Sequence, residues 1–272
     1  MPLPPPDPDA TALVTGASSG IGAEIARGLA RRGHGVTLVA RRADRLEALA
    51  AELSRRHRIR AETIAADLAT AGERDRIVGE IEQLGLTVEV LVNAAGFGTY
   101  GRFVACDRDR ELEQVRVLVE AVVDLDARFA PAMAERRRGA IINLASTAGF
   151  QSTPGSSTYS ACKAFVIFHS EALHEELRGR GVTVTAVCPG PVATEFQETS
   201  EPLFGDNLPG FLWCEAERVA EDSIRAAEDG RRTVIPGGLT LRMAFGANRR
   251  VPTAVSMPVA RRVMAAELER GA

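Results

Sequence analysis

Short β-rich segments alternate with helical stretches along almost the whole chain, and this alternation limits the folds that the sequence can adopt. Several of the β-rich segments are apolar throughout, whereas the helical stretches carry apolar residues at helical spacing. The β-rich segments are 12–14, 36–39, 60–65, 88–92, 140–144, 182–187 and 233–235. The helical stretches are one through Ile25, Leu29 and Ala30 and those over 43–55, 72–84, 107–137, 157–179 and 215–229. Apolar strands between helices indicate a parallel sheet that is covered on both faces.

We therefore predict an α/β fold, a single-domain doubly wound (Rossmann-like) parallel sheet with helices on both faces. The 272 residues, of which 45% are hydrophobic, suffice for one sizeable domain, and a second domain is not needed. We expect this domain over 11–238, after a disordered tail over 1–10 and before a helical extension over 239–272 of the same domain. Ligands bind such sheets at the carboxyl ends of the strands, so the functional residues should follow the strands.

Charge and cysteine content argue against several kinds of function. The net charge is -3, with arginines and acidic residues interleaved, so the sequence offers no basic face for nucleic acid. The four cysteines are scattered, and none of the four histidines lies at metal-ligand spacing from other potential ligands. We therefore expect no metal site. The first residues lack the basic and apolar regions of a signal peptide, and we find no apolar run of about 18 residues. We therefore expect a cytoplasmic protein.

A glycine-rich turn follows the first predicted strand and reads Thr-Gly-Ala-Ser-Ser-Gly-Ile-Gly over 15–22. Glycines permit a tight turn and a close approach of backbone to a pyrophosphate, and the following helix offers free N–H groups to phosphates. Alone, the motif is a weak signal, and a glycine-rich turn without a ligand is an equally good interpretation. Three residues rather than one separate Gly16 from Gly20, which differs from the common dinucleotide fingerprint.

Lysine and tyrosine are both rare in this chain, and one of each lies in the helical stretch 157–179. Lys163 is the single lysine among 33 basic residues, and Tyr159 is one of two tyrosines. They are four residues apart, so they share one helix face. A cation at roughly 4 Å, in an effective dielectric near 20, favours the phenolate by about 4 kcal/mol, or about three pKa units. We therefore expect Lys163 to bring Tyr159 towards a pKa suited to acid–base catalysis, the alternative being chance spacing.

These two motifs resemble those of the short-chain dehydrogenase/reductase family, whose signatures are Thr-Gly-x-x-x-Gly-x-Gly and Tyr-x-x-x-Lys. The resemblance implies an oxidoreductase that transfers hydride between a nicotinamide cofactor and a carbonyl or alcohol. It makes Tyr159 the acid or base, Lys163 a ligand of the nicotinamide ribose, and Ser146 the residue that holds the carbonyl oxygen. It further implies cofactor binding by Gly16, Ser18, Ser19, Gly20, Ile21, Gly22, Arg41, Arg42, Asp67, Leu68, Asn93, Ala94, Ala95, Gly96, Tyr159, Lys163, Pro189, Gly190, Val192 and Thr194.

Arg41 and Arg42 directly follow the second predicted strand and favour NADP(H) as the cofactor. An NAD enzyme usually carries an Asp or Glu near this point to bind both ribose hydroxyls, whereas an arginine can pair with a 2′-phosphate. The alternative is that these arginines merely open a solvated helix in an Arg-rich chain.

One position departs from the family pattern. Leu118 stands where many members carry an asparagine thought to hold a water in the proton relay, and residues 97–142 contain no asparagine. Leucine cannot hydrogen-bond, so such a water would depend on backbone carbonyls and Lys163. This departure favours the rival hypothesis of an NADP(H)-binding sensor or scaffold with weak or no turnover. The complete set of Ser146, Tyr159 and Lys163 favours the enzyme.

The sequence after the sixth predicted strand bears on substrate and partners. Residues 195–215 are apolar and turn-rich, as suits a lid over a hydrophobic ketone or 3-ketoacyl substrate, with Phe150 and Tyr100 adding to the pocket wall. A loop packed on the core or on another subunit is the alternative. The tail over 239–266 mixes apolar residues and arginines, and could close the pocket, cover a subunit interface or touch a membrane surface. By resemblance we expect a homodimer or homotetramer.

Overall fold

The structure is a computed structural model, and it describes residues 3–196, 213–238, 241–243, 246, 251, 254–258 and 261–262. The strands are β1 (Ala10–Thr15), β2 (Val36–Ala40), β3 (Ala61–Ala65), β4 (Thr87–Asn93), β5 (Gly139–Leu144), β6 (Val182–Val187) and β7 (Thr233–Val234). The α-helices are α1 (Gly20–Arg31), α2 (Ala43–His57), α3 (Ala71–Gln83), α4 (Arg108–Val115), α5 (Ala121–Arg136), α6 (Ser157–Leu177) and α8 (Ala216–Glu228). Strands and helices alternate as the sequence pattern predicts.

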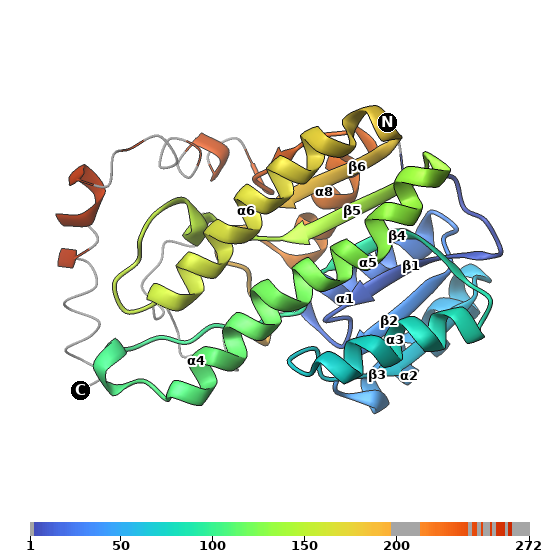
Figure 1. The fold of residues 1–272 in the computed structure, drawn as a ribbon, viewed down its shortest axis with the longest axis horizontal. Coiled ribbons are helices and arrows are strands. Elements are labelled where there is room, and N and C mark those ends of the chain that lie inside the picture. Colours follow the sequence, from blue (N-terminus) through green and yellow to red (C-terminus); the bar gives the residue numbers. More distant parts are fainter. Residues whose placement is uncertain are drawn as a thin grey trace.

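The strands form one seven-stranded sheet in the order β3-β2-β1-β4-β5-β6-β7, and every neighbouring pair is parallel. The predicted doubly wound parallel sheet is therefore confirmed. The chain moves outward from β1 to β3 and then returns to place β4 on the other side of β1 (Figure 1). Such a switch point opens a crevice at the carboxyl ends of β1 and β4, where this class of sheet binds its ligands.

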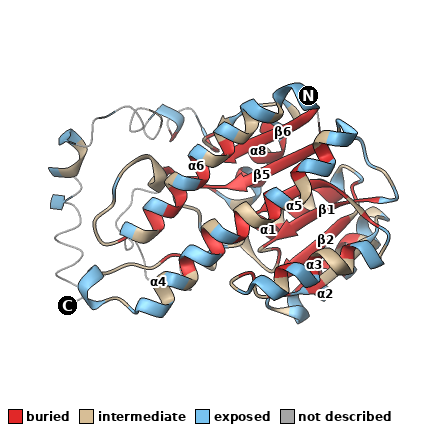
Figure 2. Cartoon of the chain, in the orientation of Figure 1, coloured by how far each residue is buried: buried red, intermediate tan, exposed pale blue. Residues whose placement is uncertain are grey.

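Two core clusters lie on opposite faces of the sheet, because neighbouring residues of a strand point to opposite sides. In β1, Ala12 and Val14 belong to one cluster and Leu13 to the other. Helices α1, α2 and α8 pack into the first cluster, and α3 and α5 into the second. Figure 1 shows α3, α5 and α6 across the near face, and Figure 2 shows the buried strands between the layers. The predicted helices on both faces are confirmed.

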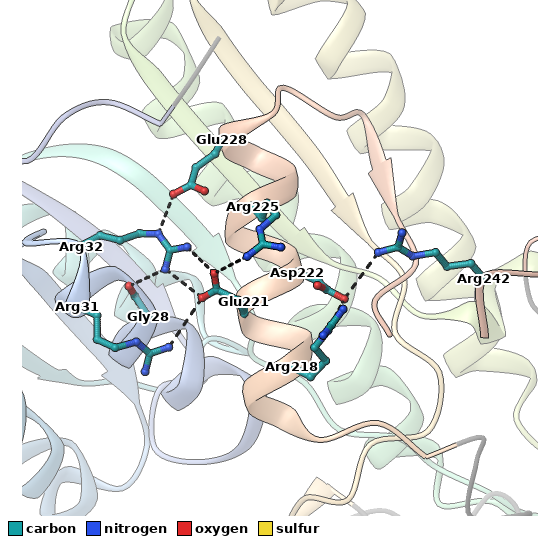
Figure 3. A network of polar contacts seen from close by, with 9 residues as sticks. All are labelled: Gly28, Arg31, Arg32, Arg218, Glu221, Asp222, Arg225, Glu228 and Arg242. Carbon is teal, nitrogen blue, oxygen red and sulfur yellow. Dashed lines mark hydrogen bonds and ion pairs between the residues drawn. The ribbon is translucent and has the colours of Figure 1, made fainter. Parts of the chain in front are cut away.

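Helix α8 is held on α1 by close backbone packing and by ion pairs (Figure 3). A Cβ at Gly28 would lie 2.5 Å from Ile224 Cδ1, so the Ile224 side chain packs directly against this glycine. Arg32, which directly follows α1, pairs with Glu221 at 2.8 Å and with Glu228 at 2.7 Å. These contacts fix α8 against the helix that follows the glycine turn.

The chain before β1 differs from the expected disordered tail. Leu3 is 8% exposed and belongs to the first core cluster, and Arg138 donates a hydrogen bond to the Pro5 carbonyl at 2.9 Å. Strand β1 already begins at Ala10, which we assigned to the tail. A buried apolar side chain and a backbone hydrogen bond offset the entropy of ordering this proline-rich segment, which its composition does not reveal.

The long helix predicted over 107–137 is interrupted. Helix α4 ends at Val115, a π-helical turn η2 (Arg116–Glu120) follows, and α5 begins at Ala121. A π-helical turn accommodates an extra residue inside a helix and is frequent at functional sites. Leu118 lies in this turn.

Most of the segments expected to form the lid and the helical extension lie outside the described residues. Of 195–215, the structure describes 195, 196 and 213–215; of 239–272, it describes 241–243, 246, 251, 254–258 and 261–262. Their roles stay predictions. Among the described helices, none combines the length and apolar character that crossing a bilayer requires.

Candidate active site

The glycine turn after β1 presses its backbone against the residues that follow β4. Gly16 and Gly20 have φ of 66° and 56°, a region that glycine adopts without strain. A Cβ at Gly16 would lie 2.8 Å from the Ala94 carbonyl oxygen, and one at Gly22 would lie 2.5 Å from the Gly16 carbonyl oxygen. These glycines are therefore required by backbone contacts, and their lack of side chains leaves the turn open to a ligand.

Thr15 ties the ends of β1 and β4 together. Its Oγ1 donates to the Val92 carbonyl at 3.2 Å and accepts from the backbone N–H groups of Ala94 at 3.0 Å and Ala95 at 3.2 Å. The first turn of α1, all of whose residues are described, holds no acidic side chain, and Ser19 makes no side-chain cap. The helix therefore presents free N–H groups and its positive end to the crevice, which fits the pyrophosphate of a dinucleotide.

The structure separates the two arginines that follow β2. Arg42 donates to Ser18 Oγ, at 2.9 Å from Nη2, and to Ser19 Oγ at 2.9 Å, so it lies against the glycine turn. Arg41 turns towards α4, where its Nη1 is 3.5 Å from a carboxylate oxygen of Glu113, and its side chain is 62% exposed. Arg42, with two hydroxyls beside it, thus has donors that fit a phosphate.

The residues after β3 form a fixed corner of the crevice. Asp67 Oδ1 accepts from the Ala69 N–H at 3.0 Å, and Leu68 is 5% exposed. The Leu68 carbonyl accepts from the buried Arg74 guanidinium at 2.7 Å, which also donates to Asp124 at 2.6 Å. Sequence reasoning missed Arg74, because it is one arginine among many and only its burial distinguishes it.

Asn93, at the end of β4, belongs to a buried polar network. Its Nδ2 donates to Asp126 Oδ1 at 2.9 Å and to Asn143 Oδ1 at 2.8 Å. Asp126 also accepts from Asn143 Nδ2 at 2.9 Å and lies 3.0 Å from His169 Nε2. The network joins β4 and β5 to α5 and α6 behind the residues Ala94, Ala95 and Gly96. Sequence reasoning missed Asn143, although it is the one polar side chain in the otherwise apolar β5.

Ser146, Tyr159 and Lys163 come together beyond the end of β5. Tyr159 and Lys163 lie on α6, 9% and 6% exposed, and Lys163 Nζ donates to the Leu144 carbonyl at 2.6 Å. Ser146 begins the turn η3 (Thr147–Phe150), and its side chain hydrogen-bonds Tyr159. A Cβ at Gly149 would lie 2.6 Å from the Lys163 carbonyl carbon, so a glycine lets η3 and with it Ser146 approach α6.

Burial sets the acid–base properties of this group. Burial raises the pKa of Tyr159 to about 12. A hydrogen bond with Ser146 lowers this pKa, but its effect is smaller than that of burial. Burial also lowers the pKa of Lys163 to about 8. The expectation that Lys163 brings Tyr159 towards neutrality is therefore wrong for this structure. Lys163 is not among the causes that shift the pKa of Tyr159, and the same burial that penalises the phenolate also penalises the ammonium.

The segment after β6 contacts two other regions, the turn η3 that follows Ser146 and the start of α1. The Pro189 carbonyl accepts from the Thr147 N–H at 3.0 Å, which links Gly190 and its neighbours to η3. Val192 pairs with Cys214 in an isolated parallel bridge. A Cβ at Gly20 would lie 3.3 Å from the Thr194 side chain, so Thr194 lies at the start of α1, beside Ile21. The segment after β6 therefore contacts both η3 and the start of α1.

Leu118 and the amine of Lys163 both lie next to Gly96. It is 1% exposed and forms a cluster with Tyr159 and Cys162. A Cβ built on Gly96 would lie 2.6 Å from Leu118 Cδ2 and 4.0 Å from Lys163 Nζ. An apolar side chain therefore occupies the place next to Lys163 where the resemblance leads one to expect an amide. In the part of the chain that the structure describes, no group of three or more His, Cys, Asp or Glu side chains could hold a metal ion.

Comparison with known proteins identifies the family. A family model described as short chain dehydrogenase matches residues 10–202, so the chain belongs to this family. A very-long-chain 3-oxoacyl-CoA reductase of Anas platyrhynchos is 36% identical over 208 residues, 74% of this chain and 65% of that protein. The chain thus matches slightly less than two thirds of that relative's length.

Two solved structures of bacterial proteins resemble this one closely. A short-chain dehydrogenase of Sphingobium yanoikuyae, in complex with NADPH, has a TM-score of 0.79 and 32% identity, covering 89% of this chain and 93% of its own. The bulky-bulky ketone specific alcohol dehydrogenase of Comamonas testosteroni has a TM-score of 0.74 and 29% identity, covering 93% and 97%. These likenesses agree with the parallel sheet order described above and with the family assignment.

Proposed function

We propose that this protein is an NADP(H)-dependent oxidoreductase that transfers hydride between nicotinamide and a carbonyl or alcohol. The observation that carries the proposal is the convergence of Ser146, Tyr159 and Lys163 at the strand ends, next to an open glycine turn. When bound, the cofactor supplies or accepts the hydride. The protein's own residues hold the carbonyl oxygen and move a proton.

Carbonyl reduction suits the protonation states of these residues. With a pKa of about 12, the Tyr159 hydroxyl is protonated at neutral pH, as a proton donor to a developing alkoxide must be. The Ser146 hydroxyl, already hydrogen-bonded to Tyr159, would hold the same oxygen. Lys163, with a pKa of about 8, exchanges its proton readily near neutral pH and can restore the proton that Tyr159 loses.

NADP(H) is favoured over NAD(H) by the residues at the end of β2. The strand ends at Ala40 and is followed by Arg41 and Arg42, so two cations stand where an NAD enzyme carries an acid. Arg42 and the hydroxyls of Ser18 and Ser19 offer donors to a 2′-phosphate. The NADPH complex of the Sphingobium relative supports the same choice.

The substrate is proposed to be a hydrophobic ketone or a 3-ketoacyl compound. The surroundings of Tyr159 are apolar: Leu118 and Cys162 are buried with it, and Phe196 packs with ring centroids 5.9 Å apart. The names of the relatives, a reductase of very-long-chain 3-oxoacyl-CoA and an alcohol dehydrogenase of bulky-bulky ketones, point to substrates of the same kind. We also propose a cytoplasmic homodimer or homotetramer. Phe165 and Phe168, exposed by 41% and 68% on α6, support pairing through this helix.

The rival hypothesis, an NADP(H)-binding sensor or scaffold with weak turnover, rests on Leu118. Its side chain offers no hydrogen bond beside Lys163, so a relay water would depend on backbone carbonyls of the π-helical turn and on the amine. A slow chemical step with normal cofactor binding is what this hypothesis expects.

One assay distinguishes the oxidoreductase from the sensor or scaffold. Oxidation of NADPH and NADH is followed by absorbance with aliphatic, aromatic, steroid and 3-ketoacyl carbonyls, for the wild type, Tyr159→Phe and Lys163→Met. We expect turnover with NADPH in the wild type and its loss in both variants, with NADPH binding by Tyr159→Phe retained as the control. NADPH binding without reduction of any carbonyl would favour the sensor, and a preference for NADH would contradict the assignment of Arg42.

A further inference from the structure

A carboxylate of the protein itself lies against the arginines that follow β2. Glu195 Oε2 accepts from Arg42 Nη1 at 2.9 Å, and its Oε1 accepts from Arg45 Nη1 at 2.5 Å. Glu195 comes directly after Thr194, so the segment that follows β6 is tied by this side chain to the start of α2. One carboxylate thus bridges two guanidinium groups.

The same arginine also faces the glycine turn. While Nη1 of Arg42 binds Glu195, its Nε and Nη2 donate to Ser18 Oγ at 3.2 and 2.9 Å, and Nη2 donates to Ser19 Oγ at 2.9 Å. Two guanidinium groups therefore bind one internal anion, and one of them, that of Arg42, also donates to two hydroxyls. The two arginines hold the pKa of Glu195 near 2, so this carboxylate is ionised throughout the physiological range.

A phosphate uses the donors that this carboxylate already occupies. Guanidinium groups bind carboxylates and phosphates through the same planar array of N–H donors, and the stronger hydrogen bonds go to the group with more charge. A 2′-phosphate that reaches Arg42 beside Ser18 would compete with Glu195 for these donors and would be repelled by its charge.

We propose that Glu195 is an internal counter-anion of the 2′-phosphate site, which NADP(H) must displace and NAD(H) does not meet. The inference rests on the proposed function, since it presumes that Arg42 receives the 2′-phosphate. It makes Glu195 a specificity-determining residue that weakens the preference for NADP(H) set by the arginines. In the absence of the cofactor, Glu195 also holds Arg42 and Arg45 in place.

The expected effect is moderate, because the ion pairs are partly exposed. The side chains of Arg42, Arg45 and Glu195 are 40%, 43% and 35% exposed. Removing the charge of Glu195 removes both ion pairs that compete with the ligand, and should tighten binding of a 2′-phosphate by about fivefold. A ligand without this phosphate should bind within about twofold of the wild type.

The test is calorimetric titration with adenosine 2′,5′-bisphosphate, and with AMP as the matched ligand that lacks the 2′-phosphate. The proteins are the wild type, Glu195→Gln, Glu195→Ala and Arg42→Gln, each checked for a normal unfolding transition. Glu113→Gln is the matched control, because it removes the same charge from the carboxylate paired with Arg41. We expect both Glu195 variants to gain affinity for the bisphosphate alone, Arg42→Gln to lose it, and Glu113→Gln to change neither ligand.

The results that overturn the inference differ from those that overturn the proposed function. If Arg42→Gln loses the bisphosphate but neither Glu195 variant gains it, or if AMP gains equally, Glu195 is not a counter-anion and the NADP(H) assignment stands. A gain in Glu113→Gln instead would move the 2′-phosphate to Arg41 and also refute the role of Glu195. Equal affinity of the wild type for both ligands, unchanged in Arg42→Gln, would refute the NADP(H) assignment itself.

Discussion

The burial of Lys163 predicts that the stability of the protein rises with pH in a way that Lys163→Met lacks. The pKa of this amine falls from 10.5 to about 8 on folding, because the charged form loses water. Between these values the unfolded chain binds a proton that the folded chain does not, so unfolding becomes less favourable as pH rises. The cost of burying the charge is therefore nearly full at pH 7, below the folded pKa, and is relieved as pH approaches 10.5.

The magnitude follows from the same two values. A shift of this size corresponds to about 3 kcal/mol in total, of which about 2 kcal/mol is recovered between about pH 7 and pH 9.5. The hydrogen bond from Nζ to the Leu144 carbonyl, 2.6 Å long, contributes at both pH values, since a neutral amine also donates. Tyr159 is present in both proteins, so its own titration cancels in the comparison.

The assay is urea unfolding of the wild type and Lys163→Met at pH 7 and pH 9.5, followed by circular dichroism. The free energy of unfolding of the wild type, minus that of the variant, should increase by about 2 kcal/mol from the lower to the higher pH. A difference that is flat or that falls with pH would show that the amine is charged and well solvated or paired in the folded protein, which would refute the assigned effect of burial.

Further predictions concern the cofactor turn and the core. Gly22→Ala should weaken NADPH binding at least about tenfold in a fluorescence titration, because its Cβ would lie 2.5 Å from the Gly16 carbonyl oxygen and displace the turn; unchanged binding would contradict this. Leu118→Ala should lower the free energy of unfolding by about 2–5 kcal/mol, as for a fully buried leucine. Asp126→Asn should cost about 1–3 kcal/mol, because an amide cannot accept from Asn93, Asn143 and His169 as the carboxylate does. The free energy of unfolding of Leu118→Ala and of Asp126→Asn, measured by chemical denaturation, tests these two predictions.

The sequence predicts the fold well because its signals are local. Apolar strands and helical periodicity place the elements of the sheet within a few residues, and the motif residues follow the strands as the fold class requires. The π-helical turn at Arg116–Glu120 escapes such analysis, since one extra residue in a helix leaves the apolar pattern almost unchanged. The same limit applies to Leu3, whose burial depends on contacts with distant parts of the chain.

Part of the candidate site can likewise be predicted from the sequence, and part of it cannot. Residue types and spacing single out Tyr159 and Lys163, and the family resemblance adds Ser146. The pKa values of Tyr159 and Lys163 depend on burial, which spacing does not reveal. The ion pair of Arg42 with Glu195 joins residues 153 positions apart, and no sequence pattern connects them. Long-range polar contacts of this kind require the three-dimensional structure.

Hydride transfer, the central claim, is tested most directly with NADPH carrying deuterium at the transferable position of the nicotinamide. The protein is incubated with this cofactor and a hydrophobic 3-ketoacyl or bulky ketone substrate, and the alcohol is analysed by mass spectrometry. The account predicts one deuterium on the former carbonyl carbon with the wild type and no labelled alcohol with Tyr159→Phe, which should still bind the cofactor. Alcohol without deuterium, or equal labelling by Tyr159→Phe, would contradict it.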